Sequence, residues 1–265
     1  IEEIEHPIVR EALKMMEIDY PLEITTFADV PAQTGLGSSS AFSVGLVHAL
    51  SALKGEMITK HQMASMAAEI EVNRLKRNMG KQDHWASAYG SLNSFTFLSD
   101  EAVIVDPVFC RPEILSQLQH NLLLFYTRLK RNASDVLAAQ EKEVPRKRKV
   151  LGQMRDLVPE MRDVLAKGVD LNRIGEILHE GWSLKRSITS EISSHEIDKF
   201  YNLALSNGAL GGKLLGAGGG GFLLFYVEPQ NQSKVIESLK DLFFMKVGLD
   251  AGGSRITYYD QTKVN

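Results

Sequence analysis

A glycine-rich turn that runs directly into three serines and an apolar helical stretch constrains this chain more than any other feature. Residues 31–50 read PAQTGLGSSSAFSVGLVHAL. The glycines let the backbone curl and bring its N–H groups close to an anion, and the serines stand where a helix N-terminus has unpaired N–H groups and a positive dipole end. The pattern predicts a loop that binds a triphosphate, followed by a helix over residues 38–53. The residues expected to bind the phosphates are Gly35, Leu36, Gly37, Ser38, Ser39 and Ser40.

The same pattern has a simpler interpretation, because a turn rich in Gly and Ser with a serine N-cap starts many ordinary helices. Two other phosphate-binding motifs are excluded. The chain contains no G-x-x-x-x-G-K-[ST], and the loop lacks the third glycine of a dinucleotide-binding fingerprint. The phosphate interpretation therefore depends on what the rest of the chain contains.

Two carboxylates frame the end of a second predicted helix. Its apolar spacing runs over residues 59–78 and predicts an end near Met79 and Gly80. Glu71 lies on this helix, and Asp83 lies twelve residues later in a loop with the sequence GKQD. A helix end and a turn between them would bring both carboxylates to the mouth of one pocket. Taken alone, each acid has the simpler interpretation of a solvated surface charge.

A glycine-rich loop between two apolar runs is the third landmark, with the sequence GGKLLGAGGGGFLLFYV over residues 211–227. Gly216, Gly218 and Gly221 formally match G-x-G-x-x-G, but FLLFYV follows as a buried strand, whereas a dinucleotide-binding loop leads into a helix. A flexible linker is the alternative, and the apolar runs on both sides argue against it. We expect a strand, a glycine loop and a second strand.

Together these segments resemble the motifs of the GHMP kinases, the family of galactokinase, homoserine kinase, mevalonate kinase and phosphomevalonate kinase. Further runs, among them HPIVREAL, FYTRLKRNASDVLAAQ and GEILHEGWSLKRSI, are most similar to members that phosphorylate the anomeric hydroxyl of a heptose 7-phosphate, so the resemblance covers almost the whole chain. It implies an α+β fold with a ribosomal-protein-S5-like N-terminal lobe over residues 1–110 and a ferredoxin-like C-terminal lobe over residues 111–265. It also implies ATP and Mg²⁺ as cofactors and a sugar phosphate as substrate.

The resemblance assigns roles to particular residues. Ser39 and Glu71 would hold Mg²⁺, which takes oxygen ligands and keeps several waters. Asp83 would orient the attacking hydroxyl and accept its proton, or would only orient it, since a loose phosphoryl-transfer transition state needs little deprotonation. His84 follows directly, and we expect it to pack or to line the substrate pocket rather than to relay protons.

The glycine loop and two cations complete the implied site. The loop would close over the active site and lie against the phosphate loop. On the substrate side we expect Gly216, Gly218, Gly219 and Gly220. Arg131 and Lys185 are the candidates for binding the phosphate that the substrate already carries, although each alone is more simply a solvated charge. The rivals to a heptose phosphate kinase are a fucose or galactose kinase, and a catalytically silent protein of the same fold that binds ATP and sugar.

The first motif of the family, which supplies sugar-binding groups and often a basic residue beside the aspartate, has no counterpart in the 265 residues. Two interpretations remain: the natural chain carries this segment before Ile1, or the protein is truncated and inactive. We expect the first, because a lobe without its first strands would leave open sheet edges and an exposed core.

The remaining pattern supports two lobes that cross over near residues 108–112. PLEITTFAD predicts a strand before the phosphate loop, and SLNSFTFL and AVIVDP predict two more. The second lobe would hold the strand NLLLFYT and helices over residues 133–166, 171–188 and 195–207. An amphipathic helix, SKVIESLKDLFF, and a closing strand, SRITYYD, would complete it.

Charge and hydropathy exclude several classes of partner. The net charge of −3 and the pI near 6.2 give no electrostatic basis for binding nucleic acid. Cys110 is the only cysteine, so no intrachain disulfide can form, and we expect the protein in the reducing cytoplasm. No apolar run is long enough to indicate a membrane span. The sequence leaves a homodimer open.

Overall fold

A computed structural model describes residues 1–30, 34–129 and 133–260 of the chain. Contacts divide the chain into two compact units. The first unit has three segments: Ile1–Ala32, Gly37–Ile104 and Asp250–Asn265. The second unit has two segments: Gln33–Leu36 and Val105–Leu249. The units differ from the predicted division after residue 110 in three places. The start of the phosphate loop and residues 105–110 belong to the second unit, and the C-terminal segment belongs to the first.

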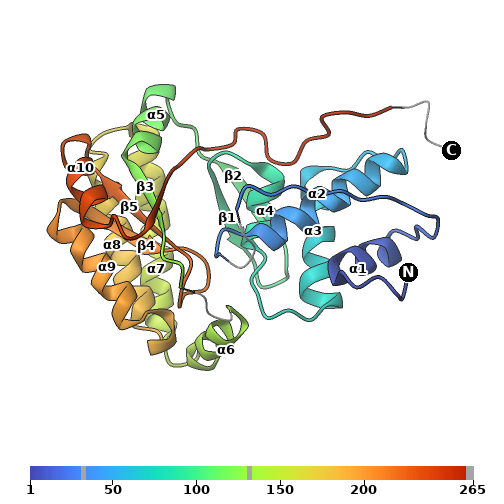
Figure 1. The fold of residues 1–265 in the computed structure, drawn as a ribbon, viewed down its shortest axis with the longest axis horizontal. Coiled ribbons are helices and arrows are strands. Elements are labelled where there is room, and N and C mark those ends of the chain that lie inside the picture. The colour runs from blue at the N-terminus through green and yellow to red at the C-terminus, as the bar shows by residue number, and fades with distance from the viewer. Residues whose placement is uncertain (31–33, 130–132, 261–265) are drawn as a thin grey trace. The chain divides into compact units, whose positions relative to one another are not determined.

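Helices make up most of the first unit (Figure 1). Its elements are α1 (Pro7–Met15), α2 (Ser38–Leu53), α3 (Lys60–Ala68), the π-helix η1 (Glu69–Arg74), α4 (Gln82–Tyr89), and the paired strands β1 (Asn93–Phe97) and β2 (Val103–Pro107), the second of which leads into the other unit. α2 has the bounds that the sequence predicts. It packs on both α3 and α4, and its Val44 and Val47 are fully buried, so the phosphate loop leads into the core of this unit.

The second predicted helix is shorter than its sequence pattern indicates. α3 gives way at Glu69 to η1, and the helical turns end at Arg74 rather than near Met79. Lys76 has a φ of 49°, a left-handed conformation that stops a helix. The GKQD run, expected as a loop, leads into α4, so Asp83 lies in the first turn of that helix.

Two segments expected to be strands are not strands. Residues 21–29 and 254–260 form no ladder with another strand among the described residues. The C-terminal segment bonds to helices instead: the N–H of Ser254 donates to the carbonyl of Ser87 over 3.1 Å, and Nδ1 of His48 lies 2.9 Å from Oγ of Ser254. The start of SRITYYD is therefore held to helices of the first unit through Ser254, while the side chains of Ile256, Tyr258 and Tyr259 are exposed.

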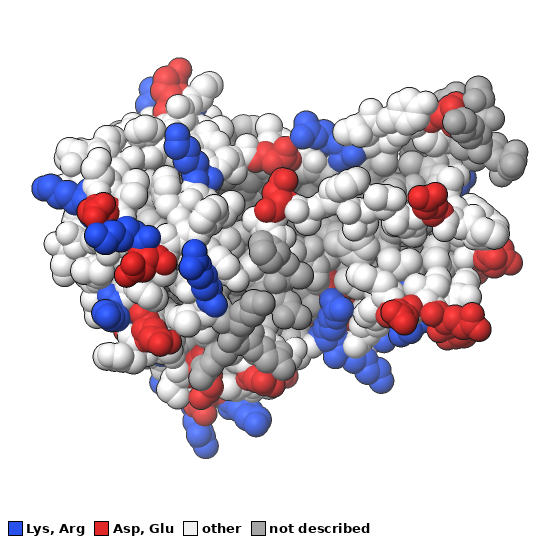
Figure 2. Space-filling model, viewed as in Figure 1, with Lys and Arg blue, Asp and Glu red and all other residues white. Residues whose placement is uncertain are grey.

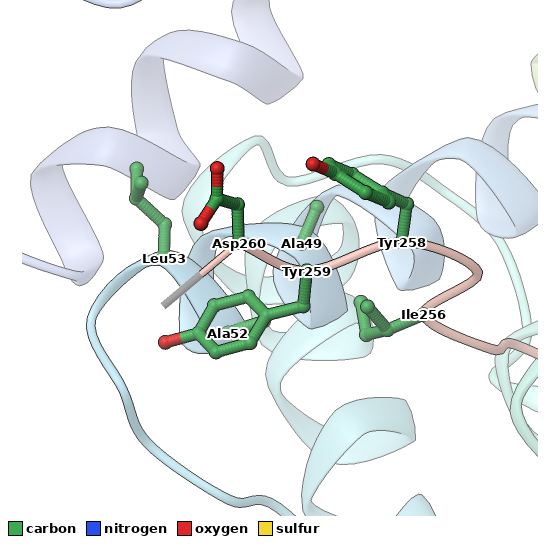
Figure 3. A pocket seen from close by; sticks show the side chains of 7 residues that line it. All are labelled: Ala49, Ala52, Leu53, Ile256, Tyr258, Tyr259 and Asp260. Carbon is green, nitrogen blue, oxygen red and sulfur yellow. The ribbon is translucent and has the colours of Figure 1, made fainter. Parts of the chain in front are cut away.

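This C-terminal segment packs closely within the first unit. A side-chain carbon built at Gly90 would lie only 2.1 Å from the backbone nitrogen of Gly253, so two glycines are needed where the segment crosses the end of α4. Farther along, the segment and α2 line a pocket of about 230 Å³ (Figure 3). Its lining residues are Ala49, Ala52, Leu53, Ile256, Tyr258, Tyr259 and Asp260. No residue of the predicted site lines this pocket.

A four-stranded antiparallel sheet is the centre of the second unit (Figure 1). Its strands are β3 (Leu122–Tyr126), β4 (Ala209–Leu214), β5 (Phe222–Val227) and β6 (Phe243–Lys246). The spatial order is β4-β5-β3-β6, so the first and third strands of the unit are central and the second and fourth are at the edges. This is the ferredoxin-like arrangement that the sequence predicts.

The helices of the second unit are α5 (Pro112–Asn121), α6 (Ala133–Glu143), α7 (Arg148–Lys167), α8 (Asn172–Arg186), η2 (Ser190–Ile192), α9 (His195–Ser206) and α10 (Pro229–Ser238). α8 packs along β4, and the core between sheet and helices contains Phe125, Leu214 and Phe225 with Trp182 and Tyr201. The single helix expected over 133–166 is two helices, and the end of SKVIESLKDLFF is strand β6 because it pairs with β3.

The surface carries both signs of charge. On the face seen in Figure 2, Lys and Arg side chains are interspersed with Asp and Glu side chains. None of the described helices combines the length and the hydropathy that a membrane span requires.

Candidate active site

The start of α2 is an uncapped helix N-terminus. Gly37 is its N-cap, with φ 68° and ψ 22°, a left-handed conformation that favours glycine. Among the described residues, no side chain caps this helix end. The hydroxyl oxygens of Ser38 and Ser40 are buried, and neither has a hydrogen-bond partner in the part of the chain that the structure describes. Buried hydroxyls without partners at a helix N-terminus form a polar site that an anion would satisfy.

Asp83 approaches this helix start from α4. A side-chain carbon built at Gly37 would lie 3.2 Å from Cγ and 3.3 Å from Oδ2 of Asp83. Because glycine has no such carbon, the carboxylate can lie directly against the turn that precedes α2. The end of the phosphate loop and the aspartate of the GKQD run therefore meet inside one unit.

Glu71 is the centre of a buried hydrogen-bond network in the same unit, and its side chain is fully buried. Its Oε2 accepts a hydrogen bond from Oγ of Ser43 over 2.9 Å and lies 3.1 Å from Nε2 of His84. Its Oε1 accepts a hydrogen bond from Oγ of Ser39, and Nη1 of Arg77 lies 2.5 Å from the same oxygen. The two carboxylate oxygens therefore have separate sets of partners.

Burial alone would raise the pKa of Glu71. The hydrogen bonds from His84, Ser39 and Ser43, together with the charge of His84, act in the opposite direction and lower the pKa to about 2. Glu71 is thus ionised at neutral pH. A buried negative charge stands within hydrogen-bond reach of a serine in the first turn of α2.

The π-helix η1 presents Glu71 to this network. The N–H of Leu75 donates to the carbonyl of Ile70 over 3.0 Å, the wider hydrogen-bond spacing of a π turn. Ile70 and Glu71 follow one another and are both fully buried. π turns inside helices are frequent at functional sites, and this one carries the carboxylate that the sequence singled out.

In the first unit, the predicted metal and catalytic residues lie with three neighbours whose contact with Glu71 the sequence did not reveal. Ser43 lies one helical turn after Ser39, a spacing that could have identified it. Arg77 gave no signal, because an isolated arginine after a helix is typical of a solvated surface. His84, expected to pack or to line the substrate pocket, is fully buried and contacts Glu71.

The glycine loop of the second unit packs against backbone on several sides. A side-chain carbon at Gly218 would lie 2.8 Å from the carbonyl oxygen of Ile192, and one at Gly220 would lie 2.4 Å from that of Leu129. Gly219 contributes a backbone hydrogen bond, from its N–H to the carbonyl of Ile192 over 2.9 Å. A side chain at Gly218 or Gly220 would collide with the backbone, which explains why these two positions are glycines.

Part of the phosphate loop lies on this glycine loop, inside the second unit. A side-chain carbon at Gly216 would lie 2.7 Å from Cα of Gly35, and one at Gly35 would lie 2.9 Å from the carbonyl oxygen of Leu215. A side-chain carbon at Gly221 would lie 2.3 Å from the carbonyl oxygen of Thr34. Thr34 and Gly35 therefore lie against the glycine loop, the contact that the family resemblance implies.

Of the two cations predicted to bind the substrate phosphate, the structure describes only Lys185. Nζ of Lys185 donates a hydrogen bond to the carbonyl of Gly216 over 2.6 Å, so this lysine lies beside the glycine loop. Arg131 lies outside the described residues.

Replacing Gly37 by alanine tests the contact between the phosphate loop and Asp83. A left-handed alanine costs about 1 kcal/mol, and the added carbon would also push on the Asp83 carboxylate. Gly55→Ala is the matched control, because Gly55 has φ 71° and open space around it. We expect both variants to lose similar stability in urea unfolding, while only Gly37→Ala loses phosphotransfer activity. Equal activity in the two variants would contradict the placement of Asp83.

Replacing His84 tests the support of Glu71. His84→Leu leaves Oε2 of the buried carboxylate with Ser43 alone, so we expect the free energy of unfolding to fall by about 1–3 kcal/mol. His84→Gln keeps a side-chain N–H donor and should recover part of the loss. Urea unfolding of both variants measures the difference. If the leucine and glutamine variants were equally stable, the hydrogen bond to Glu71 would not support the fold.

Comparisons with known proteins agree with the three motifs. The sequence profile described as "GHMP kinases N terminal domain" matches residues 7–91, and the profile described as "GHMP kinases C terminal" matches residues 153–243. A D-glycero-alpha-D-manno-heptose 7-phosphate kinase of Campylobacter jejuni is 30% identical over 233 residues, which are 84% of this chain and 68% of that protein. A galactokinase of Pyrococcus furiosus is 26% identical over 240 residues, which are 80% of this chain and 66% of that protein.

Among solved structures, a D-glycero-D-manno-heptose 1-phosphate kinase from Bacteriodes thetaiotaomicron is similar, with a TM-score of 0.75 and 26% identity. The match covers 97% of this chain and 77% of that one. The chain spans about two thirds of the length of the two curated relatives named above. The two-lobe fold expected from the motifs is thus confirmed. The chain belongs to the GHMP kinase family and is a phosphotransferase.

Proposed function

We propose that the protein transfers the γ-phosphoryl group of ATP to the anomeric hydroxyl of D-glycero-D-manno-heptose 7-phosphate, which gives the 1,7-bisphosphate. The observation that carries the proposal is the approach of the Asp83 carboxylate to Gly37 at the uncapped N-terminus of α2. The choice of sugar rests on the relative from Campylobacter jejuni, whose name states this substrate. Its place would be the cytoplasmic synthesis of activated heptoses for surface glycans.

In this mechanism the N-terminus of α2 binds the phosphates of ATP through backbone N–H groups and the hydroxyls of Ser38 and Ser40. Asp83 orients the sugar hydroxyl and accepts its proton as the bond to phosphorus forms. Phosphoryl transfer passes through a loose transition state, so positioning and charge neutralisation contribute most of the rate. The contact between Asp83 and the helix start brings the base close to the phosphates.

The donor set fits Mg²⁺. Ser39 and Glu71 offer a hydroxyl and an ionised carboxylate that are in hydrogen-bond contact, and Mg²⁺ prefers such oxygen ligands with several waters and phosphate oxygens. Bound there, Mg²⁺ would neutralise the charge of the transferring phosphoryl group.

The phosphate that the substrate already carries needs a cation. Lys185 lies beside Gly216 of the glycine loop and is our choice among the described residues for this role. Arg131, which follows β3 in the sequence, remains the second choice.

ADP release by the full-length protein with Mg²⁺ and ATP tests the substrate. The acceptors are heptose 7-phosphate, unphosphorylated heptose, galactose, fucose and mevalonate. The proposal predicts turnover with heptose 7-phosphate and little with the others. Turnover with galactose or fucose alone would keep the kinase and replace the sugar. Tight ATP binding without turnover on any acceptor would identify a silent member of the family.

A further inference from the structure

Arg77 bonds both oxygens that the proposed Mg²⁺ would use. Its Nη1 lies 2.5 Å from Oε1 of Glu71 and 3.2 Å from Oγ of Ser39. Its own backbone N–H donates to the carbonyl of Glu71 over 3.0 Å, which fixes the main chain of Arg77 beside the carboxylate. A guanidinium thus stands where a divalent cation would bring the same two ligands together.

We propose that Arg77 is a cation that exchanges with the metal: it neutralises the Glu71 site before nucleotide binds, and it yields Oε1 of Glu71 and Oγ of Ser39 when Mg·ATP arrives. The inference rests on the proposed function, because that function supplies the metal. It adds a residue that controls when the metal site is open.

The partners of Glu71 determine which oxygen can be exchanged. Oε2 is held by Ser43 and His84, both inside the core, so it has no room for a third ligand from outside. Oε1 faces Ser39 and Arg77 and is the oxygen left for an incoming cation. His84 faces only Oε2, so a cation at Oε1, either Arg77 or the metal, lowers the cost of burying this carboxylate.

Arg77 is able to leave, whereas Glu71 is not. The side chain of Arg77 is 36% exposed and that of Glu71 is 0% exposed, so the arginine can turn into solvent without breaking the core. When its guanidinium leaves Glu71, Arg77 is still beside the first turn of α2, where the proposed function puts the phosphates of ATP. A guanidinium binds phosphate oxygens well. The metal and the nucleotide then bind together: Mg²⁺ alone must displace Arg77 without compensation, whereas Mg·ATP gives Arg77 a new partner.

Binding of Mn²⁺ without nucleotide, followed by the electron paramagnetic resonance signal of free Mn²⁺, tests this exchange on the full-length protein. Removing one charge-assisted hydrogen bond changes an equilibrium by about tenfold to a hundredfold. We therefore expect Arg77→Gln to bind Mn²⁺ at least about tenfold more tightly than the wild type. Arg77→Lys, which keeps a positive charge at this position, should stay close to the wild type.

Arg74→Gln is the matched control, because Arg74 lies in η1 with the same 36% exposure and pairs with Glu11 and Glu69 instead. It should leave Mn²⁺ binding unchanged. Unaltered or weaker Mn²⁺ binding by a folded Arg77→Gln protein would overturn the exchange. An effect of the same size in Arg74→Gln would show that general surface charge is responsible and would also overturn it.

Thermal unfolding gives a second reading that does not depend on turnover. Without metal, Arg77→Gln should unfold at a lower temperature than the wild type, because Oε1 of Glu71 loses its guanidinium partner, and Mn²⁺ should stabilise the variant more than it stabilises the wild type. If Mn²⁺ failed to bind the wild type even with ATP, the proposed metal site would be wrong. If Mn²⁺ with ATP bound normally and Arg77→Gln changed nothing, only the exchange would be wrong.

Discussion

Replacing Asp83 by asparagine is expected to lower kcat by about 10²–10⁴-fold, the range that a positioned general base contributes. Asparagine has nearly the same shape, so the contact with Gly37 and the fold of α4 should survive. It can orient a hydroxyl by hydrogen bonding, but it cannot accept the proton. Steady-state kinetics with Mg·ATP and the sugar phosphate measure the loss, and the KM for ATP should change little.

The control for Asp83→Asn is Asp83→Ala, which removes both orientation and proton acceptance. A much larger loss in the alanine variant would show that Asp83 mainly positions the hydroxyl, and equal losses would show that it mainly accepts the proton. Urea unfolding should find all three proteins folded. Unchanged turnover in both variants would contradict the role of Asp83 in catalysis.

Replacing Glu71 by glutamine is expected to cost about 3 kcal/mol of stability at neutral pH and to abolish tight metal binding. The size follows from the pKa, which lies at about 2 in the folded protein against an ordinary value of 4.5, so the folded state favours the ionised carboxylate. Because the pKa is lowered on folding, this stabilisation is fully present above pH 4.5 and is lost as the pH falls toward about 2. Urea unfolding across this range measures it.

The wild type and Glu71→Gln should therefore converge in stability as the pH falls from 4.5. Glu69→Gln is the control for this titration, because Glu69 lies in the same π-helix with a side chain that is 44% exposed. Its difference from the wild type should be small, because this side chain is partly solvated. A Glu71→Gln difference that stayed constant from neutral pH to below pH 4.5 would show that the buried charge of Glu71 does not stabilise the fold.

The elements that the sequence predicts correctly are those whose structure depends on residues next to a motif. The helix over 38–53 was predictable because a glycine in a left-handed conformation and a serine run mark its start. The glycine loop was predictable because the apolar runs around it could only be buried strands, and β4 and β5 are paired on either side of it. Both features depend on the backbone near a motif, which the sequence encodes directly.

The sequence fails where a residue's role depends on distant partners. The run SRITYYD alternates like a strand, yet it pairs with no described strand and is held to helices of the first unit through Ser254. Arg77 looks like a surface charge because its contact with Glu71 follows from the early end of the helix at Arg74 and the turn after it. His84 follows Asp83 in the sequence, but only the packing of α4 against α2 and α3 reveals that it contacts Glu71. These contacts form the part of the candidate site that sequence reasoning missed.

Phosphorus NMR of the product that the full-length protein forms from heptose 7-phosphate and Mg·ATP would establish both the acceptor hydroxyl and the role of Asp83. We expect a new anomeric phosphate resonance beside an unchanged 7-phosphate resonance, and loss of that product with Asp83→Asn. A new phosphate on another hydroxyl, or an anomeric phosphate formed equally well by Asp83→Asn, would contradict this expectation.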